Sequence, residues 1–379
     1  NSYLIGAGLL IAGGILIVYW TRKEKLVLPE FNPGGKIELP ISKKILSSWQ
    51  FITSLALNIF LIVQFVRHDN SNYLAVIWII SLIPIMILAW QLDSRAKTQL
   101  SPNLQRKDIV IVLLVLFAGF LFGAYRLEGV PNFLMGDEGT FWTTARDIAR
   151  GNYAPLAFDF GVYTYPILSS IYQAAIMKLT GINMWGWRFS SVLAALFTIP
   201  ALYLLTREIF NRKIATISII ALIFSPYFLA FSRFGYNNSQ TLLPVTLAIA
   251  CGYLGFKRSS FFYLILAGYA AGIGFYTYTA AQSGILILGL LTFILLFQKK
   301  GQRKQVVLAG ITILMGWYLV AGPQRIFGLL NSQESFQVKL EESIFFNAEY
   351  ATSFLPEDQI PVETGFYFGE NQEFFYDTT

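Results

Sequence analysis

The sequence predicts an all-α polytopic membrane protein, and three observations support this prediction. Hydrophobic residues make up 55% of the 379 residues, while charged residues make up 13%, about half the share of about 25% that soluble domains carry. Apolar stretches long enough to cross a bilayer recur along the chain. The basic residues, which give a formal net charge of +6, cluster between alternate stretches. A large soluble globule, a disordered chain and a disulfide scaffold are therefore excluded.

Ten stretches are candidates for transmembrane helices, because about 20 apolar residues cross the hydrocarbon core. They cover residues 4–20, 47–66, 73–91, 109–125, 188–206, 214–231, 239–256, 261–279, 282–297 and 306–322. Their interiors hold almost no charged residues. This makes a transporter the weakest alternative, since coupled transporters place ionisable residues inside the bilayer.

The positions of the basic residues predict the orientation of these helices. Short loops rich in Lys and Arg stay in the cytoplasm, and the basic groups fall in alternate loops at 22–44, 95–107, 207–213, 257–258 and 299–304. We therefore expect a multi-pass protein of the cell inner or plasma membrane. Its extracytoplasmic side would carry the loop 126–187 and everything after residue 322. Because this sidedness explains the basic residues, no nucleic-acid partner is predicted.

The pattern divides the chain into three regions. Residues 1–104 carry extra N-terminal transmembrane helices, residues 105–322 form the main transmembrane module, and residues 323–379 form an acidic, aromatic tail on the extracytoplasmic side. The tail could contact an acceptor, dock on a partner subunit or begin a larger domain. Since the chain starts at Asn1 rather than Met and ends within this stretch, we expect one or both ends to be incomplete.

Two interfacial helices are predicted within the loop 126–187. Phe141, Ala145 and Ile148 recur at helical spacing over residues 139–150, and Gly151 then ends the pattern. Residues 165–180 form an amphipathic helix with a polar face of Ser169, Ser170, Gln173 and Thr180. The alternative for this segment is a short true span, which would move the basic loop 207–213 outside and break the alternation.

The acidic residues of this loop are the first candidates for chemistry. Asp137 fits a helix N-cap and equally a general base that takes the proton of an acceptor hydroxyl at the membrane surface, and the two roles are compatible. Glu138 complements the helix dipole in the first turn. Asp159, in "AFDFGVYTYP", is interpreted as a turn residue, with a second acid facing the same cavity as the alternative.

Arg233, in "SPYFLAFSRFGYNNSQ", lies on the side of the membrane where basic residues are disfavoured. It either anchors to lipid headgroups or binds a phosphate. A guanidinium suits the second role better than an ammonium group, because its planar fork of donors matches phosphate oxygens. Arg188 has the same two interpretations. The neutral side chains of Tyr236, Asn237, Asn238 and Gln240 offer hydrogen bonds of the kind that hold a sugar or a phosphate.

The remaining polar and aromatic residues carry weaker signals. Tyr276, Tyr278 and Gln282 of the hairpin 272–284 could line a polar cavity, although tyrosines are common at any membrane interface. Trp185 and Trp187 are assigned to the interfacial aromatic belt. His68 is the single histidine and Cys251 the single cysteine, which almost excludes zinc sites and Ser-His-Asp or Cys-His catalysis.

The order of these features resembles the GT-C class of integral membrane glycosyltransferases. More narrowly, it is similar to the bacterial relatives of the protein O-mannosyltransferases and of the lipid A aminoarabinose transferase, the family 39/83 type. The matching pieces lie between about residues 105 and 345. The first are a "DE" pair (Asp137, Glu138) opening an "AR" helix (Ala145, Arg146) and the aromatic-Pro segment Tyr163, Tyr165 and Pro166. They are followed by "GINMWGWRFSSVLAAL", "LTREIFNRK", "FSPYFLAFSRFGYNN" and "GIGFYTYTAA". The resemblance implies a GT-C-like bundle of about ten transmembrane helices, with juxtamembrane helices in the first large extracytoplasmic loop.

The resemblance also implies an activity. A sugar would pass from a polyprenyl-phosphate donor to a hydroxyl on a protein, lipid or cell-envelope glycan at the extracytoplasmic face, with inversion at the anomeric carbon. Asp137 would be the catalytic residue and Arg233 the phosphate ligand. The other candidate substrate-binding residues are Glu138, Asp159, Tyr165, Arg188, Asn237, Asn238, Tyr276 and Tyr278. No cofactor is expected beyond the lipid-linked donor, and a need for a divalent metal stays open.

Two departures from the family pattern reduce the number of basic residues expected around the donor. The family often has Lys or His before the Pro of the aromatic-Pro segment, where this chain has Thr164 and Tyr165, and close relatives often carry a basic residue in the hairpin, where it has Thr279 to Gln282. They favour an alternative, a catalytically silent subunit that keeps the transferase fold within a larger membrane assembly.

Overall fold

The computed structural model describes residues 37, 39, 47–98, 100, 104–129, 134 and 138–331. The expected span 4–20, the catalytic candidate Asp137 and the tail from residue 332 onward lie outside the described residues. Within the described ranges every regular element is a helix, and the only β-type pairing is an isolated bridge between Phe160 and Pro166. The predicted all-α, multi-span fold is confirmed.

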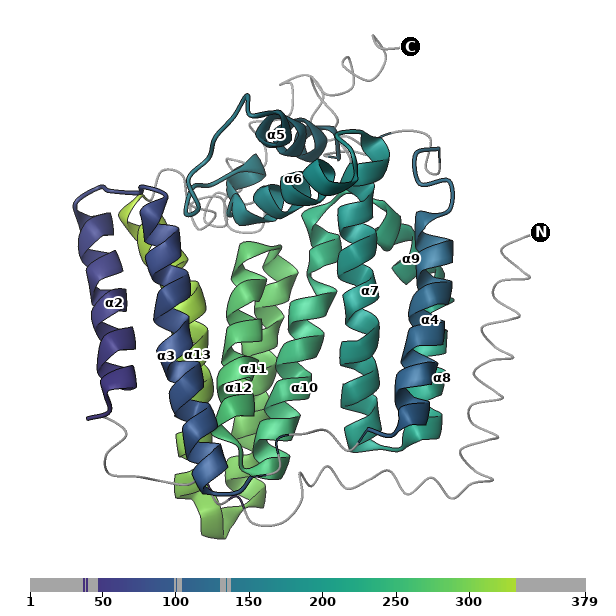
Figure 1. Ribbon diagram of the computed structural model, residues 1–379. Coiled ribbons are helices and arrows are strands. Elements are labelled where there is room, and N and C mark those ends of the chain that lie inside the picture. Colours follow the sequence, from purple (N-terminus) through teal and green to yellow (C-terminus); the bar gives the residue numbers. More distant parts are fainter. Residues whose placement is uncertain are drawn as a thin grey trace, which may run out of the picture.

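Seven helices of the described part are long and apolar enough to cross a membrane. They are α2 (Trp49–Val66), α3 (Tyr73–Arg95), α4 (Arg106–Ala124), α7 (Met184–Ile209), α10 (Leu242–Arg258), α12 (Ser283–Gln298) and α13 (Arg303–Leu330). A 3₁₀ turn precedes and extends each of the last three: η2 (Asn237–Gln240), η4 (Thr279–Gln282) and η5 (Lys300–Gln302). The helices stand side by side in one bundle (Figure 1).

Two of the nine expected spans that fall on described residues differ from straight transmembrane helices. The stretch 214–231 forms α8 (Arg212–Ile223) and α9 (Pro226–Arg233), which are bent by 55°. The break follows from the sequence, because Ser225 caps α9 through its hydroxyl and Pro226 occupies the first turn, where proline starts a helix rather than continuing one. The stretch 261–279 forms α11 (Phe261–Ile273), only 13 residues long, followed by η3 (Gly274–Tyr276).

The short helix α11 lies in the densest part of the bundle, packed against α10 and α13. Its glycines allow this approach. A Cβ atom on Gly268 would lie 2.2 Å from the carbonyl oxygen of Ile313 and 2.9 Å from the Cα atom of Gly316 on α13. Small residues of this kind let helix backbones come close in membrane proteins, so α11 is held by backbone contact rather than by length.

Buried carboxylates join the helices at the basic end of the bundle, where the Lys- and Arg-rich loops lie. Asp108 on α4 pairs with Arg212 on α8 at 2.8 Å, and Glu208 on α7 pairs with Arg258 on α10 at 2.8 Å. Asp93 on α3 accepts hydrogen bonds from the backbone of Phe261 and its neighbour at the start of α11. These carboxylates account for the rare acidic residues at the ends of the expected spans.

The opposite end, which we call the loop end, carries two helices that lie across the bundle (Figure 1). These are α5 (Glu138–Arg150) and α6 (Leu168–Thr180). With 13 residues, α6 is too short to cross a bilayer. Its polar face packs inward, with Ser169, Ser170 and Gln173 buried, while Leu179 is 82% exposed. An inward polar face and an outward apolar face suit a helix placed between protein and lipid.

Candidate functional site

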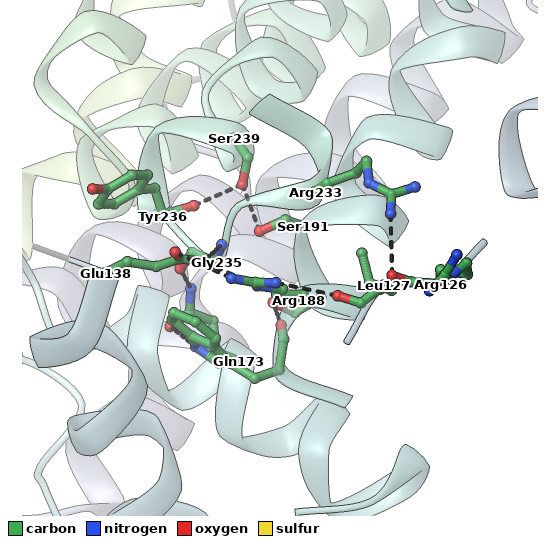
Figure 2. Close-up of polar contacts among 12 residues, drawn as sticks. Arg126, Leu127, Glu138, Gln173, Arg188, Ser191, Arg233, Gly235, Tyr236 and Ser239 are labelled. Atoms are coloured by element: carbon green, nitrogen blue, oxygen red, sulfur yellow. Dashed lines mark hydrogen bonds and ion pairs between the residues drawn. The ribbon is translucent and has the colours of Figure 1, made fainter. Parts of the chain in front are cut away.

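A buried ion pair joins the two halves of the loop end (Figure 2). Glu138 is the first residue of α5 and Arg188 lies in the second turn of α7. The Arg188 Nε atom lies 3.2 Å from Glu138 Oε1, and the two side chains are 1% and 0% exposed. Arg188 also donates to the carbonyl oxygen of Leu127 at 3.2 Å. Glu138 accepts a hydrogen bond of 3.0 Å from the backbone N–H of Gly235. Glu138 and Arg188, both candidates from the sequence, thus meet each other.

Gly235 is central to this network, although its sequence position gave no signal. Its carbonyl oxygen accepts from the side chain of Gln173 at 2.7 Å, and Gln173 in turn accepts from the indole of Trp187 at 3.3 Å. A Cβ atom on Gly235 would lie 2.4 Å from the Trp187 ring, so only glycine fits. The assignment of Trp187 to the interfacial belt is wrong, because the residue is fully buried. Trp185 stacks on Phe189 with ring centroids 4.7 Å apart.

Arg233 at the end of α9 is buried beside this network and bonded to backbone carbonyls. Its two terminal nitrogens donate to the carbonyl oxygens of Phe122 at 2.8 Å and Tyr125 at 2.7 Å. The last carbonyls of a helix have no intrahelical partner, so Arg233 serves as a cap for the C-terminal end of α4. Phosphate contact by Arg233 stays a prediction.

Asp159 lies in a tight turn of the loop. Its Oδ2 accepts from the backbone N–H of Leu156 at 2.8 Å, and its Oδ1 accepts from the side chain of Asn70 at 2.5 Å. This is the arrangement of a turn-forming aspartate. Farther along the same segment, Tyr163 and Thr164 both have positive φ, 51° and 60°. Two consecutive non-glycine residues with positive φ are uncommon and costly, and such strain gathers at functional sites.

The strained turn forms one wall of a pocket, which we call the loop-end pocket. The other walls are the hairpin between α11 and α12 and the last turns of α13. It is lined by Phe160, Thr164, Tyr165, Pro166, Phe275, Thr277, Tyr278, Thr279, Gln282, Gln324, Arg325, Gly328 and Leu329. Two sequence candidates meet here, since the rings of Tyr165 and Tyr278 are 5.4 Å apart. The lining mixes hydroxyls, amides and one arginine with aromatic and aliphatic side chains.

An aromatic cluster fixes the loop segment above this pocket. Phe158 packs on Phe65 and Trp78 with ring centroids 4.9 and 5.8 Å apart, and its carbonyl oxygen accepts from Gln324 at 3.0 Å. The Trp78 indole donates to the carbonyl oxygen of Leu319 at 3.0 Å. The loop is therefore tied to α2, α3 and α13, and the pocket is built between fixed elements.

An apolar groove of about 290 Å³ adjoins the pocket and runs between α6, α7, α10 and α11. It is lined by Leu168, Ser169, Tyr172, Ala194, Phe197, Gln240, Leu243, Pro244, Leu247, Ala270, Ile273, Tyr276 and Thr277. Thr277 therefore borders both the groove and the loop-end pocket. Burial raises the pKa of Tyr172 to about 12, so this phenol stays protonated and donates to the carbonyl oxygen of Ser190 at 2.9 Å.

The other sequence candidates lie around the junction of pocket and groove. Asn237 is buried and donates to the carbonyl oxygen of Thr277 at 3.0 Å, and its own Oδ1 has no hydrogen-bond partner among the described residues. Asn238 is half-buried in the same turn. Tyr276 is buried, and its hydroxyl donates to the carbonyl oxygen of Val320 at 2.8 Å. Tyr276 thus serves the packing of α13 while its ring borders the groove.

Carboxylates do not gather in this region. Within the part of the chain that the structure describes, no group of three or more His, Cys, Asp or Glu side chains could hold a metal ion. The side chain of Asp137 lies outside that part.

Comparison with known proteins supports the resemblance read from the motifs. Residues 164–321 match the family model of dolichyl-phosphate-mannose-protein mannosyltransferases. This match confirms the resemblance to GT-C class membrane glycosyltransferases, and it includes every residue that lines the apolar groove. It ends before Gln324 and Arg325 of the loop-end pocket.

One solved structure is similar in outline: ArnT from Cupriavidus metallidurans bound to undecaprenyl phosphate. The two chains share 15% sequence identity with a TM-score of 0.45. The similarity covers 66% of this chain and 43% of that one, so this chain spans less than half the length of that protein. A search of curated proteins gave no match.

Proposed function

We propose that this protein is a glycosyltransferase that moves a sugar from a polyprenyl-phosphate donor to a hydroxyl acceptor at the extracytoplasmic face of the membrane. The observation that supports this most directly is Thr277, which lines both a pocket of mixed polarity that contains an arginine and an apolar groove. A polyprenyl phosphate has the same division into a charged head and an apolar chain. The family match over residues 164–321 agrees with this class of donor.

The chemistry needs one base and one stabilised leaving group. The Asp137 carboxylate takes the proton of the acceptor hydroxyl, and the acceptor oxygen bonds to the anomeric carbon. The bond between that carbon and the phosphate oxygen breaks, and the polyprenyl phosphate leaves with the electron pair. Attack opposite the leaving group inverts the anomeric carbon. None of these steps requires histidine or cysteine.

The Glu138–Arg188 pair supports this role of Asp137 by anchoring the start of α5. Glu138, the next residue in the sequence after Asp137, is bonded to Arg188 and to the backbone of Gly235. A base must be held within hydrogen-bond reach of its proton to act. Glu138 and Arg188 are therefore positioning residues in this proposal rather than contacts of the sugar.

Transfer from a labelled donor tests the proposal. The full chain in lipid nanodiscs receives polyprenyl-phosphate-mannose with a radiolabelled sugar, and release of the sugar to water or to an acceptor fraction is measured. Removing a general base costs about 10²- to 10⁴-fold in rate, so Asp137→Asn should abolish most turnover and leave donor binding intact. Asp147→Asn is the matched control, since Asp147 lies on α5 and pairs with Arg146 at 3.2 Å at the surface.

The outcomes separate the candidate functions. Turnover that persists in Asp137→Asn would contradict the assigned base. Donor binding by wild type without turnover on any lipid-linked sugar would favour the silent subunit instead. If wild type bound no polyprenyl-phosphate compound, the transferase assignment itself would be wrong.

A further inference from the structure

Arg325 stands out among the residues of the loop-end pocket. Among the described residues that line the pocket it is the one charged residue, and none of them is Asp or Glu. Among the described residues its side chain makes no ion pair, and its one recorded contact is with the ring of Phe275, whose centroid lies 5.4 Å from the guanidinium carbon. A cation that lines a pocket and has no carboxylate partner among the described residues is suited to an anionic ligand.

We propose that Arg325 binds a phosphate group in the loop-end pocket, and that this phosphate is the head of the polyprenyl donor. The inference rests on the proposed function and names the residue that holds its leaving group. A guanidinium presents a planar fork of donors that matches phosphate oxygens. Phosphate leaves with a negative charge, so a fixed cation beside it stabilises the departing group.

The Arg325 side chain is held in place from one side. Phe275, whose ring lies against the guanidinium, packs edge-to-face on Trp317 of α13 with ring centroids 5.4 Å apart. The preceding residue, Gln324, is tied to Phe158 through its side-chain nitrogen. Arg325 is exposed, so its guanidinium is open to an anion while the Phe275 ring supports one face of it.

Gln324 supplies a second, independent sign of a ligand. Its side chain is 3% exposed, and its Oε1 has no hydrogen-bond partner among the described residues. An unpaired buried acceptor is costly in a native protein. Since Gln324 lines the same pocket as Arg325, a hydrogen-bond donor on a ligand in this pocket would satisfy this oxygen.

The size of the pocket fits a phosphate. Its volume is about 40 Å³, room for about three water molecules at about 10–15 Å³ each, which is the size of a phosphate group and smaller than a lipid chain. The chain fits the apolar groove of about 290 Å³, which shares Thr277 with the pocket wall. Head and chain are thus separated at Thr277.

The motifs at the loop end contain few basic residues, and Arg325 supplies a positive charge to this site. Thr164, Thr279 and Gln282, all neutral, line the same pocket as Arg325 of α13. Arg233 is occupied by the carbonyls of α4. The positive charge of the site therefore comes from a different helix, at a position beyond the matched segment 164–321.

Binding of geranylgeranyl phosphate, a short polyprenyl phosphate, tests this assignment. The full chain in nanodiscs is titrated with geranylgeranyl phosphate and, separately, with geranylgeraniol, which has the same chain and no phosphate. Loss of a hydrogen-bonded charge contact should weaken binding of the phosphate about 10- to 100-fold in Arg325→Gln, with geranylgeraniol unchanged. Arg325→Lys, which keeps the charge and loses the fork, should fall between wild type and Arg325→Gln.

Controls make each outcome decisive. Arg150→Gln removes an exposed arginine from α5 at the same end of the molecule and should leave both affinities within about twofold. Equal phosphate affinity in Arg325→Gln and wild type would overturn the role of Arg325 and leave the transferase proposal standing. Equal losses for both ligands would overturn it too, since the effect would not be specific to phosphate. Failure of wild type to bind geranylgeranyl phosphate would overturn both proposals.

A competition arm distinguishes a lipid head from a soluble phosphate. Methyl phosphate carries the same head without the chain. We expect it to displace geranylgeranyl phosphate only at concentrations at least 100-fold higher, because burial of the chain in the groove adds affinity. Competition at equal concentrations would assign the pocket to soluble phosphates and refute the lipid assignment.

Discussion

Glu138→Gln is the substitution whose effect the structure specifies best, because it keeps the shape of the side chain and removes its charge. At 3.2 Å from Arg188, the Coulomb attraction is about 5 kcal/mol with an effective dielectric constant of about 20. Both side chains are almost fully buried, so the substitution removes the Glu138 counter-ion of a buried charge. Breaking such a pair by removing one partner costs about 3–5 kcal/mol, and we expect Glu138→Gln to lower the free energy of unfolding by that amount.

The assay is reversible unfolding in mixed micelles of a mild detergent and SDS, followed by tryptophan fluorescence. Arg188→Met and the double variant complete a double-mutant cycle. Because buried pairs can be replaced by apolar groups at small cost, the double variant should be more stable than the sum of the two single losses predicts, with a coupling energy of at least about 2 kcal/mol. Glu128→Gln, at an exposed turn of the same loop, is the matched control.

Two results would refute this reasoning. A loss below about 1 kcal/mol for Glu138→Gln would place the pair among weak surface ion pairs. Additive single losses would show that Glu138 and Arg188 stabilise the fold separately. If Glu138→Gln instead kept full stability and lost donor binding, Glu138 would contact substrate, as the sequence alone allows.

Two further substitutions address the residues around this pair. Gly235→Ala places a Cβ atom 2.4 Å from the buried ring of Trp187 and should destabilise the protein by about 1–3 kcal/mol, measured in the same unfolding assay. Gly129→Ala, with no atom within 4 Å of the new Cβ, should be neutral. Arg233→Met should cost about 1–3 kcal/mol and speed amide hydrogen exchange at the end of α4, whereas a pure phosphate ligand would lose donor affinity with unchanged exchange.

The helices and their ends could be predicted from the sequence because hydrophobic length and loop charge act locally. Seven of the nine described spans appear where apolar length predicts them. The two exceptions have causes in the sequence. Pro226 after Ser225 breaks the stretch 214–231, and the glycines of α11 allow a helix of 13 residues to sit in the core through close backbone contact.

The pairing of side chains at the loop end could not be predicted, because it joins residues far apart in the chain. Glu138 and Arg188 are 50 positions apart, and either charge alone fits several roles. The sequence places Trp187 in the interface because tryptophans near span ends usually lie there. In the structure its indole donates to Gln173 and its ring packs against Gly235, so it is buried. Periodicity cannot show such long-range contacts.

The arginines show how position decides the role of a charge in this protein. Arg188 lies against a buried carboxylate and Arg233 against the carbonyls of a helix end, so each is bonded within the protein. Arg325 lies against an aromatic ring, which orients the cation and leaves its hydrogen-bond donors for a ligand. A guanidinium always carries its charge, so Arg325 interacts most strongly with a group that carries negative charge as the reaction proceeds. A phosphate leaving group meets that condition, whereas a neutral sugar does not.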